Sequence, residues 1–186
     1  MKTSELAARH GMTIQQIEEL RRAVSGYFIV RKNDEQPEVY PNRVVNTGLN
    51  YLLSSGLAAG TQITAWKVAA VKTNTTPAAS MTYAVPVYSE ITATDVSETV
   101  RQAWTAGSVS GQSVSNATTG ATYTAAHTVT IYGAALVGGG TGATGLADAA
   151  GGGTMYSMSL FGTSKPLASS DTVTITYTLT QANATG

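Results

Sequence analysis

The chain has 186 residues, no cysteine and a formal net charge of zero, and only 12% of its residues are charged. A chain without cysteine forms no disulfide, no zinc–thiolate site and no thiolate nucleophile. A neutral chain lacks the field that recruits nucleic acid or an anionic membrane, and no apolar run approaches the length of about 18 residues that a membrane helix needs. We therefore expect neither nucleic acid nor a membrane as a partner.

Charge is concentrated near the N-terminus. Residues 1–50 hold 13 charged side chains, and the remaining 136 residues hold nine. An ordinary soluble domain is about one-quarter charged, with both signs spread over its surface. A long Thr-, Ser-, Gly- and Ala-rich region with few charges is what we expect where other proteins cover the surface. Charged side chains at Glu5, Arg9 and His10 do not fit a signal peptide, so we expect synthesis in a cytoplasm.

Residues 3–25 are predicted to form two short helices. The second begins at Thr13, where Gln16 completes a capping-box pattern, and it carries an apolar stripe at Ile14, Ile17, Leu20 and Val24. Such a stripe needs a partner to bury it. We therefore expect the helical pair to pack on a protein neighbour.

The spacing of the same helices also fits a helix-turn-helix. DNA binding requires several unopposed cations on the second helix, but Glu18 and Glu19 cancel Arg21 and Arg22 there. We favour the protein contact. We expect apolar packing on the neighbour from Leu6, Ile14, Ile17 and Leu20. We expect polar contacts with it from Arg21, Arg22, Arg31 and Lys32.

A β-hairpin is predicted next, with strands over 27–32 and 38–45 joined by a turn. Residues 46–56 then predict a short helix, capped by Asn46 or Thr47 and ended at Gly56. The predicted organisation is thus an N-terminal arm of helices plus hairpin over 1–45 and a β-core over 46–186.

Beyond that helix the pattern is one of short strands separated by turn-rich segments. The predicted strands are 63–71, 81–88, 97–104, 108–114, 121–137, 155–161 and 171–180. Strands of this length and spacing favour a mainly β fold, an antiparallel β-sandwich of jelly-roll or Greek-key type.

The last of these strands alternates without a slip between threonines and the apolar residues Val173, Ile175, Tyr177 and Leu179. Successive side chains leave opposite faces of a strand, so one face is apolar and the other is threonine. Beyond Asp171 this strand has no charged side chain of the kind that keeps an exposed edge strand from pairing with other strands. We therefore expect it to be central in its sheet or paired with another chain.

Candidate catalytic and cofactor sites are weak. The stretch 140–145 matches G-x-G-x-x-G, but no helix or suitably placed acidic residue follows it, so we interpret it as a hairpin loop. His127 could pair with Asp148 or Asp171, yet no spacing selects either, and we expect His127 to be a half-buried core or interface residue in a strand. No nucleophile has a base at a recognisable spacing. We expect no enzyme, no cofactor and no metal.

Two further groups are open to more than one interpretation. Glu90, Asp95 and Glu98 could serve calcium binding or glycoside hydrolysis, but we expect them to be solvated side chains of a turn. Trp66 and Trp104 could form a carbohydrate platform, although core packing is the usual role of an indole in a strand.

Three segments carry a family resemblance: RVVNTGLNYLLSSGL (43–57), AWKVAAVKTNTTPAAS (65–80) and MYSMSLFGTSKPLASSDTVTITYTLT (155–180). They resemble small structural proteins of tailed-bacteriophage virions. The resemblance implies a non-enzymatic β-sandwich in the virion, which we expect to be a capsid decoration or cement protein held by its arm. A neck, collar or tail-fibre component and a carbohydrate-binding adhesin are the alternatives. Other virion proteins and further copies of the chain are the expected partners.

Overall fold

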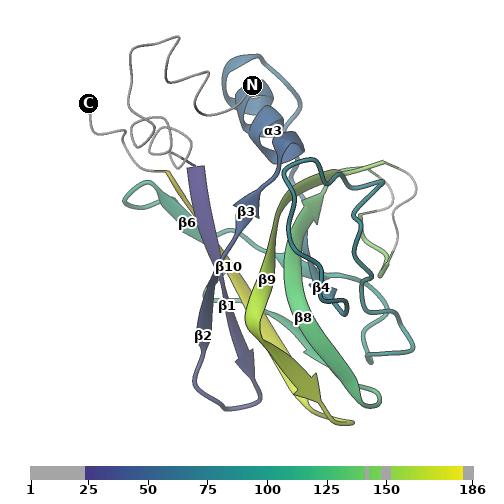
Figure 1. Ribbon diagram of the computed structural model, residues 1–186. Coiled ribbons are helices and arrows are strands. Elements are labelled where there is room, and N and C mark those ends of the chain that lie inside the picture. The colour runs from purple at the N-terminus through teal and green to yellow at the C-terminus, as the bar shows by residue number, and fades with distance from the viewer. Residues whose placement is uncertain (1–23, 141–142, 148–151, 182–186) are drawn as a thin grey trace, which may run out of the picture.

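The computed structural model describes residues 24–140, 143–147 and 152–181. The predicted helical arm lies outside these residues, except for Val24 and Ser25, which belong to a strand. The described part of the chain is mainly β, as predicted, with one helix and two antiparallel sheets (Figure 1).

Sheet A has the order β2–β1–β10, and β6 and β7 both pair with the other side of β10. Its strands are β1 (Val24–Lys32), β2 (Glu38–Pro41), β6 (Ser113–Ser115), β7 (Ala121–Thr124) and β10 (Thr172–Gln181). Sheet B has the order β3–β9–β8–β4–β5. Its strands are β3 (Arg43–Val44), β4 (Trp66–Val71), β5 (Gln102–Trp104), β8 (Val129–Gly138) and β9 (Thr154–Leu167).

The last strand, β10, lies in the middle of sheet A. It pairs with β1 along the whole of that strand, from Val24 opposite Gln181 to Lys32 opposite Val173. Its predicted apolar face is confirmed, since Val173, Ile175 and Tyr177 are fully buried. The structure shows the first of the two expected arrangements, a central position of the strand within its own sheet. A central strand needs no charged side chains to protect an edge, which explains their absence.

The predicted hairpin is confirmed as β1 and β2, which pair in register from Tyr27 opposite Pro41 to Val30 opposite Glu38. The chain then passes into sheet B through β3. Residues 24–44, which the sequence grouped with the arm, therefore contribute strands to both sheets.

Several predicted strands are wrong in extent. Residues 81–88 form no strand, and only Gln102–Trp104 of the stretch 97–104 does. The predicted strand 121–137 is two strands, β7 and β8, which lie in different sheets. Strand β9 continues to Leu167, through residues predicted as a turn.

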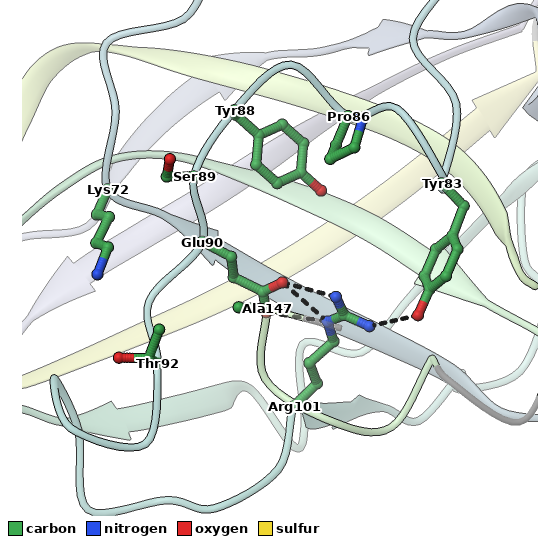
Figure 2. A pocket seen from close by; sticks show the side chains of 9 residues that line it. All are labelled: Lys72, Tyr83, Pro86, Tyr88, Ser89, Glu90, Thr92, Arg101 and Ala147. Carbon is green, nitrogen blue, oxygen red and sulfur yellow. Dashed lines mark hydrogen bonds and ion pairs between the residues drawn. The ribbon is translucent and has the colours of Figure 1, made fainter. Parts of the chain in front are cut away.

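Sheet B is buried on both faces. The connection from β4 to β5 covers its outer face and contributes Met81 and Tyr83 to a cluster with Ala69 and Val71 of β4. Tyr83, Tyr88 and Glu90 all belong to this connection (Figure 2). Burial on both faces explains why residues 68–71 of β4 and 133–137 of β8 are unbroken apolar runs, because a strand with one wet face would alternate.

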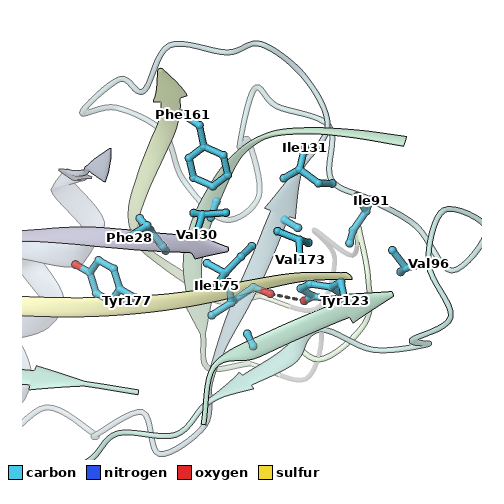
Figure 3. Packing of buried hydrophobic residues seen from close by; sticks show 14 of the residues in the cluster. Phe28, Val30, Ile91, Val96, Tyr123, Ile131, Phe161, Val173, Ile175 and Tyr177 are labelled. Carbon is cyan, nitrogen blue, oxygen red and sulfur yellow. Dashed lines mark hydrogen bonds between the residues drawn. The ribbon is translucent and has the colours of Figure 1, made fainter. Parts of the chain in front are cut away.

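The main core lies between the two sheets. Sheet A contributes Phe28, Val30, Ile175 and Tyr177, and sheet B contributes residues such as Ile131 (Figure 3). Phe28 and Tyr177 pack with their ring centroids 4.6 Å apart. Paired aromatic rings stabilise beyond their buried area by about 0.5–1.5 kcal/mol, so the β1–β10 pair is held by its side chains as well as by its backbone.

The single described helix, α3 (Asn46–Leu57), packs on β9. Neither predicted cap is correct. The N-cap is Val45, with no side-chain cap, and Thr47 Oγ1 donates instead to the Met155 carbonyl at 2.6 Å. Gly56 lies inside the helix rather than at its end. The hydroxyl of Thr47 thus ties the first turn to sheet B, an interaction that only tertiary contact can select.

Candidate functional site

A pocket of about 380 Å³ lies between the β4–β5 connection and the loop after β8 (Figure 2). Its lining residues are Lys72, Tyr83, Pro86, Tyr88, Ser89, Glu90, Thr92, Arg101 and Ala147. Pockets that bring aromatic and charged side chains together are the default candidates for function.

Arg101 and Glu90 form a buried ion pair at the floor of this pocket. The guanidinium Nε donates to Glu90 Oε1 at 2.9 Å, and Nη2 donates to Oε2 at 2.7 Å. Both side chains are at most 4% exposed. Burial alone would lower the pKa of Arg101, but the hydrogen bonds and charge of Glu90 outweigh it and hold the pKa above its ordinary value. Arg101 therefore stays charged and bound to Glu90.

The remaining donors of Arg101 tie three segments together. Nη1 donates to the Tyr83 hydroxyl and to the Ala143 carbonyl, each at 3.0 Å. Its backbone N–H also donates to the Thr144 carbonyl at 2.8 Å. The connection bearing Glu90, the entry to β5 and the loop after β8 are thus joined at one guanidinium. The geometry is that of a structural clamp.

A second cluster lies beside the first, around Asp95. Lys72 Nζ donates to Asp95 Oδ2 at 2.7 Å, and Thr92 donates to the same oxygen through its backbone N–H and its hydroxyl. His127 Nε2 lies 3.7 Å from Asp95 Oδ1. The histidine itself is exposed in the segment between β7 and β8, so the prediction of a half-buried strand position is wrong.

The acidic residues of this region are not solvated, contrary to the sequence-based expectation. Glu90 and Asp95 are buried and paired with cations, and Glu98 accepts a hydrogen bond from the backbone N–H of Thr124 at 2.9 Å. Within the described ranges, no cluster of three His, Asp or Glu side chains is placed to hold a metal ion. These carboxylates organise the connections around sheet B.

We expect acid to weaken the fold in part through Asp95. Burial would raise the pKa of Asp95, but the hydrogen bonds from Lys72 and Thr92 outweigh it and hold the pKa below 3.8. A carboxyl with a lowered pKa in the folded state stabilises above its unfolded pKa, and this stability is lost as pH falls through the lowered value. The free energy of unfolding should therefore decrease below about pH 4.

Urea unfolding of the Asp95→Asn variant measures this contribution. The variant should be less stable than the wild type at pH 7 and should lose less stability between neutral pH and acid. Asp171 has a lowered pKa too, through Asn33 first, so part of the slope remains in the variant. An unchanged slope would contradict the assignment to Asp95.

The two tryptophans lie opposite each other on neighbouring strands and line an open groove of about 540 Å³. Trp66 packs edge-on against Tyr51 and Tyr156. The Trp104 Nε1 donates to the Tyr177 carbonyl at 3.0 Å. Both indoles are half-buried against the core, which is the role the sequence favoured over a carbohydrate platform.

The Gly-rich stretch forms the connection between the antiparallel strands β8 and β9, as predicted. Gly139 and Gly140 have φ angles of 71° and 68°, in the left-handed region that glycine adopts without strain. After residues 141–142, which are not described, Ala143 is buried and Gly145 forms a bridge with Val100.

Two of the predicted interface residues fall within the described part of the chain. Arg31 is exposed on β1, and Lys32 forms an ion pair with Asp171 at 3.3 Å. The other six, Leu6, Ile14, Ile17, Leu20, Arg21 and Arg22, lie outside the described residues. Asp148, one proposed partner of His127, also lies outside them.

The sequence analysis missed Arg101 and Tyr83. A signal was present, because Arg101 is the only arginine after Arg43. A lone arginine in a charge-poor region is expected to have a carboxylate partner, since burial without one is costly.

No helix in the described ranges is long and apolar enough to cross a membrane. No family model, no curated protein and no solved structure matches the chain.

Proposed function

We propose that the protein is a non-enzymatic structural component of a tailed-bacteriophage virion, attached to the capsid as a decoration (cement) protein through its N-terminal arm. The distribution of charge carries this proposal. Six of the eight charged side chains described beyond residue 50 are engaged in ion pairs. The surface of this region is therefore mostly uncharged, which suits a protein whose faces are covered by neighbours.

The outer face of sheet A supports the same proposal. Thr122, Thr174 and Thr176 line a shallow groove there with Ile29, and the hydroxyls of Thr122 and Thr174 are 2.9 Å apart. These side chains satisfy one another across strands. Such a face offers methyl groups and a few hydroxyls to a neighbouring protein surface, and Arg31 is the one charged side chain among the residues that line the groove.

We also propose that the two sheets form a sandwich of Greek-key or jelly-roll type. The chain changes sheets four times, between β2 and β3, between β5 and β6, between β7 and β8 and between β9 and β10. Crossings of this kind are typical of Greek-key and jelly-roll sandwiches. Virion proteins assembled in many copies commonly use such sandwiches, and we propose that this chain also forms homo-oligomers.

A neck, collar or tail-fibre component is the nearest alternative, and copy number distinguishes it. A decoration protein is present in hundreds of copies per particle, whereas a tail component is present in roughly a dozen or fewer. A carbohydrate-binding adhesin is favoured less, because Trp66 and Trp104 already pack against the core.

Deletion of residues 1–23 tests attachment through the arm. The deletion must stop there, since Val24–Gly26 pair with Leu179–Gln181 of β10. We expect the truncated chain to keep its far-UV circular dichroism and most of its thermal stability but to lose binding to purified particles that lack the protein. Binding is measured by co-sedimentation.

The full-length chain with Glu35→Gln serves as the matched control, because it removes an exposed charge from the β1–β2 turn and leaves residues 1–23 and the predicted contact residues intact. Co-sedimentation of the truncated chain at the wild-type level would contradict attachment through the arm. Failure of the full-length chain to bind any particle component would contradict the proposed function as a whole.

A further inference from the structure

Helix α3 presents an apolar face that nothing in the described residues covers. Its buried face, with Gly48, Tyr51 and Leu52, lies against β9 and the core. On the opposite side Leu49, Leu53 and Leu57 are 38%, 59% and 85% exposed. These leucines are spaced four residues apart and so form one continuous stripe along the helix.

The surroundings of the stripe are free of charge. Residues 44–66 contain no charged side chain, although a helix with a solvated face normally carries charged residues on that face. Gly56 lies beside the stripe, and no atom comes within 4 Å of a Cβ built there. A small residue next to three leucines leaves room for another helix to approach closely. The face has the composition of a helix-packing surface.

The chain enters the described fold close to this helix. The Gly26 carbonyl accepts a hydrogen bond from Asn42 N at 3.2 Å, and only three residues separate Asn42 from the start of α3. Figure 1 shows that β1 begins at the end of the molecule where α3 lies. The described chain therefore begins at the end of the fold where α3 lies.

We propose that residues 13–22 dock as a helix on this stripe within the same chain, with Ile14, Ile17 and Leu20 against Leu49, Leu53 and Leu57. The two stripes match in length, since a helix rises 1.5 Å per residue and each stripe spans about 9–12 Å. Docking buries both apolar faces at once and leaves Glu19 and Arg22 toward solvent, while Glu18 and Arg21 border the apolar stripe. It fixes the position of the arm in the free protein, so attachment to a particle through Ile14, Ile17 and Leu20 would require this helix to leave α3.

A designed disulfide tests this docking, because the chain contains no cysteine. The double variant Leu20→Cys/Leu53→Cys should form an intrachain disulfide on mild oxidation of the dilute protein. The control is Leu20→Cys/Val39→Cys. Val39 is 61% exposed and pairs with Ile29, five residues from Val24, so an undocked arm could reach it.

Peptide mapping of the oxidised monomer decides the result. A disulfide in the Leu53 pair and little in the Val39 pair is the expected outcome. Equal cross-linking of both pairs, absence of a cross-link in the Leu53 pair, or a disulfide between two chains would each overturn intrachain docking.

Limited proteolysis gives a second, independent readout. Trypsin cleaves after Arg21 and Arg22, and a docked helix protects these bonds in proportion to how rarely it opens. Leu53→Asp should speed this cleavage several-fold, whereas Leu53→Met should leave it near the wild-type rate. Equal rates in the two variants would overturn the docking.

Discussion

Replacement of Arg101 by methionine should lower the free energy of unfolding by roughly 3–5 kcal/mol, the usual cost of removing one partner from a buried ion pair. The variant leaves the Glu90 carboxylate buried without its cation, and it removes the donor to the Tyr83 hydroxyl and the Ala143 carbonyl. A loss of this size is a large share of the stability of about 5–15 kcal/mol that single domains have. Urea unfolding measures it directly.

The double variant Glu90→Leu/Arg101→Met distinguishes a lost charge partner from lost packing. Apolar side chains of similar volume remove both desolvated charges, so the double variant should recover much of the stability lost by Arg101→Met. Arg101→Met alone should gain stability as the pH is lowered from 7, because a protonated Glu90 no longer carries a buried charge.

A more exposed ion pair, Lys32–Asp171, provides the matched comparison. Lys32 and Asp171 lie 3.3 Å apart with about one-fifth of each side chain exposed, and exposed pairs stabilise weakly. Lys32→Met should therefore destabilise far less than Arg101→Met. If the two losses were equal, the clamp interpretation of Arg101 would be wrong.

Replacement of Gly48 by alanine should be the second strongly destabilising change. A Cβ at Gly48 would overlap the carbonyl oxygen of Tyr156 and lie 2.9 Å from its carbonyl carbon and Cα. These are backbone atoms of β9, and the Tyr156 carbonyl accepts a hydrogen bond from Val45 N at 3.1 Å. The residues on either side, Met155 and Ser157, pair with β8, so the backbone cannot move aside as a flexible side chain would. Overpacking of this kind costs about 1–3 kcal/mol or more.

The same helix supplies the control at Gly56. Among the described residues, no atom lies within 4 Å of a Cβ built there, so Gly56→Ala should stabilise by about 0.5–1 kcal/mol through the better helix propensity of alanine. Thermal unfolding of the two variants should therefore shift in opposite directions. A Gly48→Ala protein as stable as the wild type would show that α3 is not seated on β9 as described.

The local pattern of the chain was sufficient to predict its simplest elements. The alternation of residues 171–180 predicted β10, and the turn-rich segment 33–37 predicted the hairpin β1–β2. Both depend on the period of two along a strand and on turn residues, which are properties of neighbouring residues alone. The helix over 46–56 was predicted within one residue at its end, although its caps were not.

Predictions failed where a long-range partner decides the structure. Residues 81–88 have a strand-like composition, but Pro86 and the positive φ of Val87 place them in a connection that covers sheet B. The stretch 121–137 reads as one strand, yet its two halves belong to different sheets. Periodicity cannot show where a chain leaves one sheet for the other.

The candidate site depended even more on tertiary structure. The sequence showed an acidic cluster but could not show that Glu90 lies against Arg101, or that Asp95 gathers Lys72 and Thr92. Those contacts join segments separated by up to 23 residues, and burial then changes the meaning of each charge. Sequence alone determined that this chain is mainly β and that its charge is unevenly distributed. Only the tertiary structure decided which of its few charged side chains are buried and paired, because desolvation and Coulomb attraction depend on which residues meet in space.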